Sequence, residues 1–415
     1  MIKSSRLCRI MIKDIKTKIS ELNIDFDYEA YWEIIYLILL AFFVGMRFLL
    51  STMFTIYWPK YFYRTLTVIG VVLVLMHLML SKDIKKKEIL AMLVVTFVFM
   101  MSHYVSRYDF LVDLLILLLG AYRVNFRNIL KTYIAVWSVL LVVTIIGAML
   151  GFAKNLIYFQ GDNGEHMRMT LGICYPTDLA AYVAFLMITY VCVRNYCITY
   201  LEIFIMGILS AATFYITYAK TNFILMMLII VSCIILKIIK ASSILEKKMS
   251  KIFMVGLQTF SCIFIWCLSG LFDCKNNVWL IIDKILSGRL ALGKEALCLY
   301  PPKAFGQWIY EHGFGGDMSN PDYYFFIDSS YLSIGIKYGI VFLILIIVMN
   351  SIYVIKCFKE KNIYWITMLS IIALQGFTEH HLIQYWYNPF LIFLLSGNCK
   401  MKKEKPKKDD ILDLN

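Results

Sequence analysis

Long apolar blocks, separated by short charged stretches, constrain this chain more than any other feature of its sequence. Stretches such as 34–50 and 223–236 are almost continuously apolar, and 60% of the 415 residues are hydrophobic while only 17% are charged. A transmembrane helix needs about 20 such residues to cross a hydrocarbon core of about 30 Å. A transmembrane β-barrel would instead show alternating segments of about ten residues. The sequence therefore predicts an all-α polytopic membrane protein.

The apolar blocks predict about twelve transmembrane helices in a single transmembrane domain, 30–398. An N-terminal arm, 1–29, and a charged tail, 399–415, flank this domain. The candidate spans are, in chain order, 31–50, 61–80, 89–104, 109–121, 129–151, 176–193, 199–217, 222–239, 252–271, 331–355, 363–378 and 383–398.

The net charge of +13 comes mainly from short basic groups between the apolar blocks. The preference of Lys and Arg for cytoplasmic loops explains them without a nucleic-acid partner. If both termini are cytoplasmic, the inner side holds 28 of the 41 Lys and Arg residues. This multi-pass orientation places two substantial loops outside, 152–175 and 272–330, and we expect short helices in the large extracellular loop 272–330.

Three cations lie in separate outer loops of this topology: Arg168, Lys220 and Arg289. A guanidinium group binds phosphate oxygens through two parallel hydrogen bonds, and a lysine adds a compact charge. If the loops meet, the three cations suit a lipid diphosphate. The simpler alternative is that each contacts lipid headgroups or an acidic neighbour.

Two acidic residues are candidates for a general base, Asp328 and Glu379. A carboxylate or histidine beside a cavity can take the proton of a sugar hydroxyl within hydrogen-bond reach. The alternative for Asp328 is an N-cap of the helix that follows it. We expect these residues to converge with the arginines.

Neither a metal ion nor another cofactor is expected from the sequence. Adjacent histidines such as His380 and His381 point to different sides of a helix, and no further ligands at zinc spacing are evident. The outer loops also contain no Asp-x-Asp pair. Two charges inside candidate spans, Arg47 and Asp113, are candidates to pair with each other. Whether Cys274 and Cys298 form a disulfide is left open.

Several motifs in order resemble those of the Wzy-type O-antigen and capsular polysaccharide polymerases, which belong with the O-antigen ligases among glycosyltransferases of the GT-C type. The resemblance covers about 165–395. The motifs are Arg168-x-Thr170-x-Gly172-x-x-x-Pro176, Ser287-Gly288-Arg289-Leu290, Gly306, Asp328-Ser329-Ser330-Tyr331 with Lys337-Tyr338-Gly339-Ile340, and Gly376-Phe377-Thr378-Glu379-His380 with Asn388-Pro389-Phe390.

The resemblance implies a bacterial plasma-membrane enzyme of exopolysaccharide biosynthesis that joins undecaprenyl-diphosphate-linked oligosaccharides, as donor and acceptor, on the outer side of the bilayer. Transfer would proceed with inversion and without a metal, and a flippase and a chain-length regulator would be protein partners. Its implied catalytic residues are Arg168, Arg289 and Asp328. Its implied substrate-binding residues are Gly172, Lys220, Tyr331, Glu379 and His380.

Two departures from the family pattern concern the site. Lys220 stands where members often have arginine, and Asp328-Ser329 stands where they often have His-Asn or Asp-Asn. Three alternatives remain: a ligase that transfers finished glycan to another acceptor, a flippase or exporter of the lipid-linked glycan, and a non-catalytic assembly scaffold.

Overall fold

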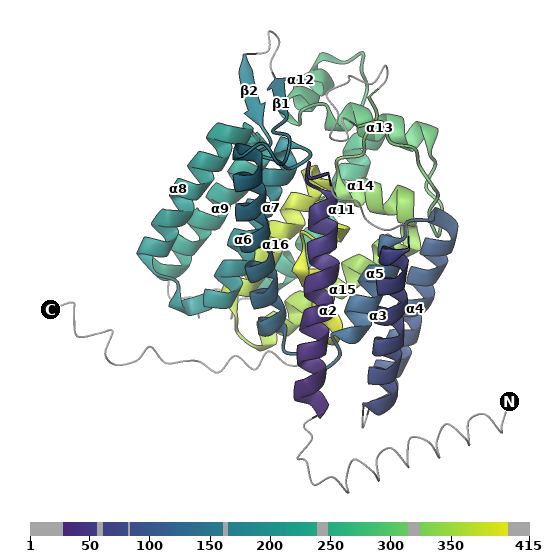
Figure 1. Ribbon diagram of the computed structural model, residues 1–415. Helices are drawn as coiled ribbons and strands as arrows, with labels where there is room; N and C mark the ends of the chain where they lie inside the picture. Colours follow the sequence, from purple (N-terminus) through teal and green to yellow (C-terminus); the bar gives the residue numbers. More distant parts are fainter. Residues whose placement is uncertain are drawn as a thin grey trace, which may run out of the picture.

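The computed structural model describes residues 28–55, 61–81, 84–160, 165–238, 248–313 and 324–396, which form a mostly helical bundle (Figure 1). The expected arm 1–29 and tail 399–415 lie outside this part of the chain, apart from the first two residues of α2. The longer helices are α2 (Tyr28–Leu50), α3 (Phe62–Leu80), α4 (Lys86–Ser106), α5 (Phe110–Gly120), α6 (Phe126–Met149), α7 (Pro176–Arg194), α8 (Tyr200–Thr217), α9 (Lys220–Ile238), α11 (Lys248–Leu271), α15 (Ile340–Lys359) and α16 (Ile363–Thr378).

Nine of the described helices are long and apolar enough to cross a membrane, while α5 and α16 are shorter apolar helices. In α3 only 17% of the most apolar window is buried, whereas in α7 the share is 72%. Helices that leave so much apolar surface uncovered would be unfavourable in water. The hydrocarbon core of a membrane accepts such surfaces. The chain thus has the architecture of an all-α polytopic membrane protein, with α7 as its most enclosed long helix.

The shorter elements gather at one end of the bundle, the upper end in Figure 1, which we call the loop end. A two-stranded antiparallel hairpin pairs Ile157 with Met169, and two short helices follow α11. These elements are β1 (Ile157–Gln160), β2 (His166–Met169), α12 (Asn277–Ile285) and α13 (Arg289–Leu299). Short helices are therefore present in 272–330, as the sequence predicts.

The expected span 383–398 is not an α-helix. The chain after α16 forms two 3₁₀ segments, η3 (His380–Ile383) and η4 (Pro389–Leu395). We call 380–396 the interior segment. It starts beside the loop end of α16 and ends where Ser396 pairs with Tyr122, which follows the far end of α5. The ring centre of Phe393 lies 6.2 Å from that of Trp365, which is near the beginning of α16. The segment therefore runs back along the whole of α16.

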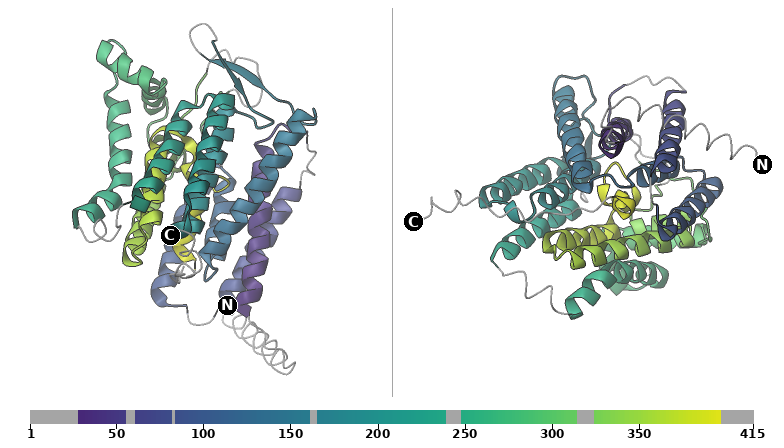
Figure 2. Two further views of the ribbon diagram at one scale, coloured as in Figure 1. Left: turned by 90° about the vertical axis from the view of Figure 1, so that its left-hand side faces the viewer. Right: turned by 90° about the horizontal axis from the view of Figure 1, so that it is seen from below.

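The interior segment lies among the helices rather than outside them, and Figure 2 shows it near the centre of the bundle when viewed from below. An irregular backbone at membrane depth must be buried in protein, because lipid offers no hydrogen bonds. Side chains supply them here: the Tyr133 hydroxyl donates to the Tyr385 carbonyl at 2.8 Å, and the Trp137 indole donates to the Trp386 carbonyl at 3.0 Å. The apolar sequence of this segment predicts an apolar environment. In this protein the surrounding helices provide that environment, and lipid does not.

The expected span 331–355 is also interrupted. It consists of α14 (Ser330–Ser333), a π-helical turn η2 (Ile334–Tyr338) and then α15, with Gly339 at the break. Gly339 has φ +105°, and a Cβ there would lie 2.3 Å from the Ala304 carbonyl oxygen. The loop that follows α13 therefore passes directly over the break, and only glycine permits this approach.

The expected pairing of the two intramembrane charges is confirmed. Arg47 Nη2 lies 2.7 Å from Asp113 Oδ2, and Tyr63 contributes a hydroxyl to the same carboxylate. The pair joins α2 to α5, and a paired charge of this kind is far less costly than a lone one at membrane depth.

Replacing Gly339 with alanine is expected to destabilise the protein by at least about 2 kcal/mol, since backbone strain of this kind costs roughly 1–3 kcal/mol before any clash is counted. Thermal unfolding of the purified full chain in detergent measures the effect. Gly207→Ala is the matched control, because a Cβ at this position in α8 meets nothing within 4 Å. Equal thermal midpoints for Gly339→Ala and Gly207→Ala would contradict the close approach of the loop after α13 to the helix break at Gly339.

Candidate functional site

Arg289 is the first residue of α13 and reaches across to the end of α16. Its Nε donates to the Thr378 carbonyl at 2.6 Å, and its Nη1 donates to the Leu286 carbonyl at 3.2 Å. Nη2 lies 3.0 Å from Glu379 Oε1, with the arginine side chain 11% exposed. Three separate acceptors therefore fix the guanidinium group, which is a positioned charge rather than a freely moving one.

Glu379 receives that charge in a nearly closed environment. The residue is 2% exposed. Burial raises the pKa of its carboxyl group to about 7, with Asp328 adding to the rise and the cations Arg289 and Arg168 opposing it. A carboxyl group that exchanges its proton near neutral pH is suited to general acid–base chemistry.

Arg168 comes to the same end of the bundle from strand β2. Its Nε donates to the Thr217 carbonyl at 2.8 Å, at the end of α8, and its guanidinium carbon lies 5.6 Å from the centre of the Tyr175 ring. Burial lowers the pKa of this arginine. Its charge also lowers the pKa of Glu379, so both arginines act on one carboxylate.

Asp328 lies beside this group and contacts it only through its charge. Burial raises the pKa of its carboxyl group, Arg289 lowers it and Glu311 raises it. The interpretation of Asp328 as a helix cap is wrong, because the N-cap of α14 is Ser329 and no side chain caps that helix. Among the described residues Asp328 has no hydrogen-bonding partner.

Ser330 fixes the turn that presents Glu379. Its backbone nitrogen donates to the Glu379 carbonyl at 3.2 Å, and its hydroxyl donates to the same oxygen at 2.5 Å. That hydroxyl also accepts from the Leu382 nitrogen at 3.1 Å. One serine thus ties α14 to both sides of the turn, which explains why Asp328 and Glu379 lie close together although 51 positions separate them.

The expected convergence of site residues is confirmed for Arg289 and Glu379, with Arg168 and Asp328 close enough to shift the pKa of Glu379. The contact found for Lys220 is with the Tyr218 ring, 5.1 Å away, and its side chain is exposed. Within the described part of the chain, no contact joins it to the two arginines.

Two other predicted substrate-binding residues occupy packing positions. The Tyr331 side chain is fully buried, and its hydroxyl donates to the Ala373 carbonyl at 2.6 Å. Gly172 has φ +87°, and a Cβ there would lie 3.0 Å from the Thr144 carbonyl oxygen. The geometry of both residues favours a role in holding helices together. Cys274 and Cys298 are both unpaired.

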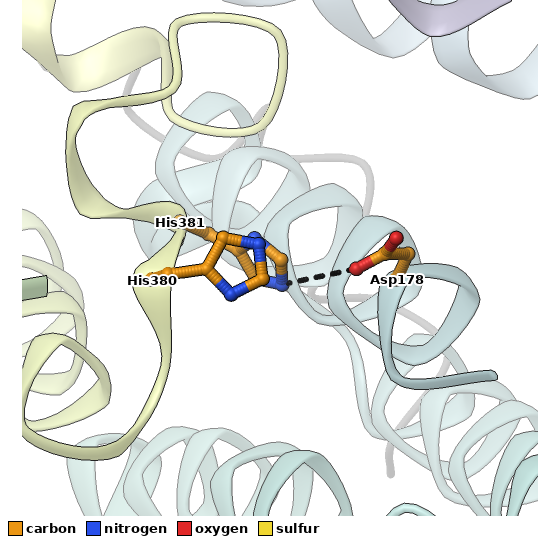
Figure 3. A group of neighbouring side chains, drawn as sticks. All are labelled: Asp178, His380 and His381. Carbon is orange, nitrogen blue, oxygen red and sulfur yellow. Dashed lines mark ion pairs between the residues drawn. The ribbon is translucent and has the colours of Figure 1, made fainter. Parts of the chain in front are cut away.

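His380 and His381 lie side by side rather than diverging, and Figure 3 shows both rings beside Asp178. Their ring centres are 4.1 Å apart. The expectation that adjacent histidines point apart is wrong here, because the two residues follow α16 in a 3₁₀ turn. Sequence reasoning missed Asp178, although it is the one acidic residue in the apolar block 176–193.

The charges at the loop end do not cancel within this group. Three carboxyl groups, on Asp178, Asp328 and Glu379, lie at this end of the bundle, and Asp328 adds to the rise in the pKa of Glu379. Two guanidinium groups, Arg168 and Arg289, stand against them. Such a group of acids and bases at the edge of an apolar bundle can bind a polar headgroup, and it can move a proton.

Comparison of the chain with protein-family models, with curated proteins and with solved structures found no match.

The protonated form of Glu379 is expected to disappear as the pH rises through about 7. Because the pKa of this carboxyl group in the unfolded chain is near its ordinary value of 4.5, the folded chain binds an extra proton between pH 4.5 and about 7, and stability falls as pH rises across that window. Infrared difference spectroscopy of the full chain measures the carboxylic-acid C=O band directly. Glu379→Gln should remove the component that titrates near neutral pH, and an unchanged titration in that variant would contradict the assignment.

Proposed function

We propose that this protein is a polysaccharide polymerase that joins oligosaccharides carried on undecaprenyl diphosphate. The observation that supports this most is the buried carboxyl group of Glu379, which has a pKa near neutrality, pairs with Arg289 and is close enough to Arg168 for that charge to lower its pKa. A diphosphate leaving group needs cations, and an attacking hydroxyl needs a base. The resemblance of the motifs to Wzy-type polymerases supplies the substrate class.

The proposed reaction is a single inverting displacement. A carboxylate, Glu379 or Asp328, takes the proton of a hydroxyl on the acceptor's non-reducing-end sugar, and the hydroxyl oxygen forms a bond to the anomeric carbon of the donor. The bond from that carbon to the diphosphate oxygen breaks with its electron pair. Arg289 and Arg168 stabilise the undecaprenyl diphosphate that leaves, so the transfer step itself requires no metal.

Glu379 is the stronger of the two candidates for the base when the substrate is bound. Its pKa of about 7 matches the pH at which proton transfer is most efficient. Its contact with Arg289 orients the carboxylate, and a diphosphate that attracts Arg289 would free the carboxylate for the hydroxyl. Asp328, which lacks such a partner within the described residues, is then placed to hold a sugar hydroxyl.

The orientation in the membrane belongs to the same proposal. Twelve crossings, the last made by the interior segment, put the loop end outside a bacterial plasma membrane and the chain before α2 in the cytoplasm. The basic groups between apolar blocks favour this direction. The apolar surfaces of the outer helices would then contact both the bilayer and the polyprenyl tails.

Purified full-length protein, incubated with defined lipid-linked repeat units, is expected to produce a ladder of longer glycans. Arg289→Ala and Arg168→Ala should each reduce the rate by at least about 100-fold, the typical cost of losing one preorganised charge-stabilising group. Arg289→Lys keeps the charge but loses the planar guanidinium group that binds phosphate through two hydrogen bonds. Its rate should lie between those of these variants and the native chain. Electrophoresis of the glycans measures the ladder.

Arg64→Ala is the control, because Arg64 is an exposed arginine near the beginning of α3 with no place in the site. Thermal midpoints of all variants separate a loss of fold from a loss of activity. Transfer of one block to a single acceptor, without a ladder, would favour the ligase alternative. No transfer by the native chain with intact substrate would reject both.

A further inference from the structure

Three side chains at the loop end bring atoms that can bind a metal ion close together. Asp178, in the first turn of α7, faces His380 and His381 of η3 (Figure 3). One ligand atom from each residue lies within 4.8 Å of the other two. Asp178 and the two histidines are about 200 positions apart in the sequence. Only the fold brings them together.

The protonation of His381 is fixed by its neighbour. Its Nδ1 lies 3.1 Å from the Gln384 side-chain oxygen, and because that oxygen only accepts, Nδ1 must carry the hydrogen. Nε2 then presents an electron pair, and it lies 3.8 Å from Asp178 Oδ1. This distance is too long for a hydrogen bond and leaves two acceptors facing each other.

The acceptor atoms are also buried and unsatisfied. His381 is fully buried, with its side chain 0% exposed. Its Nε2 and the Nδ1 of His380 have no hydrogen-bonding partner within the described residues. An unsatisfied buried polar atom costs about 1–3 kcal/mol, and a cation between His381 Nε2 and the Asp178 carboxylate, which face each other, would remove that cost.

The surrounding charge favours the same conclusion. Asp328 and Glu379 lie at the same end of the bundle as Asp178, and Arg289 is already paired with Glu379. Two neutral imidazoles add no positive charge. A divalent ion beside Asp178 would offset the excess of negative charge.

We propose that Asp178, His380 and His381 bind one divalent transition-metal ion of the zinc type. Two imidazoles and one carboxylate form a ligand set that zinc accepts, with the fourth position open to water. Imidazole nitrogen disfavours magnesium and calcium, which prefer oxygen. Ligand atoms on one zinc ion are at most about 4 Å apart, because each bond is roughly 2.0–2.2 Å long, so small side-chain rotations close the site.

The ion would link α7 to the turn after α16. His380 directly follows Glu379, so the link holds the turn that carries the Glu379 side chain toward Arg289. Gln384, through its contact with His381 Nδ1, is a positioning residue of the kind that metal-bound histidines commonly use. The inference does not rest on the polymerase proposal, since it concerns binding and stability and assigns the ion no part in the transfer.

Cobalt(II) added to metal-stripped full-length protein in detergent is expected to give visible d–d absorption bands that saturate at one ion per chain. Zinc(II) should compete with cobalt and raise the thermal midpoint. Asp178→Asn and His381→Gln should abolish the bands, and Gln384→Ala should weaken binding by about 10- to 100-fold, as loss of such a supporting contact does elsewhere.

His103→Gln is the matched control, because His103 lies outside the cluster and contacts the Tyr108 carbonyl; it should leave the bands unchanged. Absence of cobalt bands in the folded native chain would overturn the proposal and indicate a proton at Asp178 instead. Bands that persist in folded Asp178→Asn and His381→Gln, or bands with the sulfur charge-transfer absorption of cysteine ligands, would overturn it as well. Gln384→Ala keeps all three ligands and provides a test if the ligand variants fail to fold.

Discussion

The bundle depends on hydrogen bonds that its helices donate to an irregular backbone at its centre. The interior segment crosses the centre without an α-helical ladder, and Tyr133 and Trp137 donate hydrogen bonds to its carbonyl groups. Lipid could not replace these donors, so the surrounding helices must enclose the segment completely. That enclosure brings the loop ends of α7, α13 and α16 together, and the candidate site lies where they meet.

The site combines burial with attachment to backbone. Arg289 and Arg168 each donate to a carbonyl at the end of a helix, where the helix dipole is negative and unsatisfied carbonyls are available. These contacts hold the cations in place at little cost in side-chain freedom on binding. The loop end is therefore organised before any ligand arrives, which is the condition for effective charge stabilisation.

The sequence was sufficient for the fold class, for the Arg47–Asp113 pair and for the expectation that Arg289 and Glu379 lie at one site. It was insufficient for the interior segment, because hydropathy measures transfer out of water and does not distinguish lipid from a protein interior. Asp178 was missed for a related reason: an acid in the first turn of a helix is ordinarily explained by the helix dipole. The close approach of the His380 and His381 rings depends on a 3₁₀ turn that no residue pattern in the sequence indicates.

The central position of the interior segment constrains the order of assembly. It follows α2, α6, α7 and α16 in the chain, yet these helices surround it. A segment whose carbonyl groups need donors such as Tyr133 and Trp137 gains little from entering lipid alone, whereas an α-helix partitions independently. The segment must therefore enter a groove that the earlier helices have already formed, and its insertion closes the bundle. Assembly of this protein ends at its core rather than at its surface.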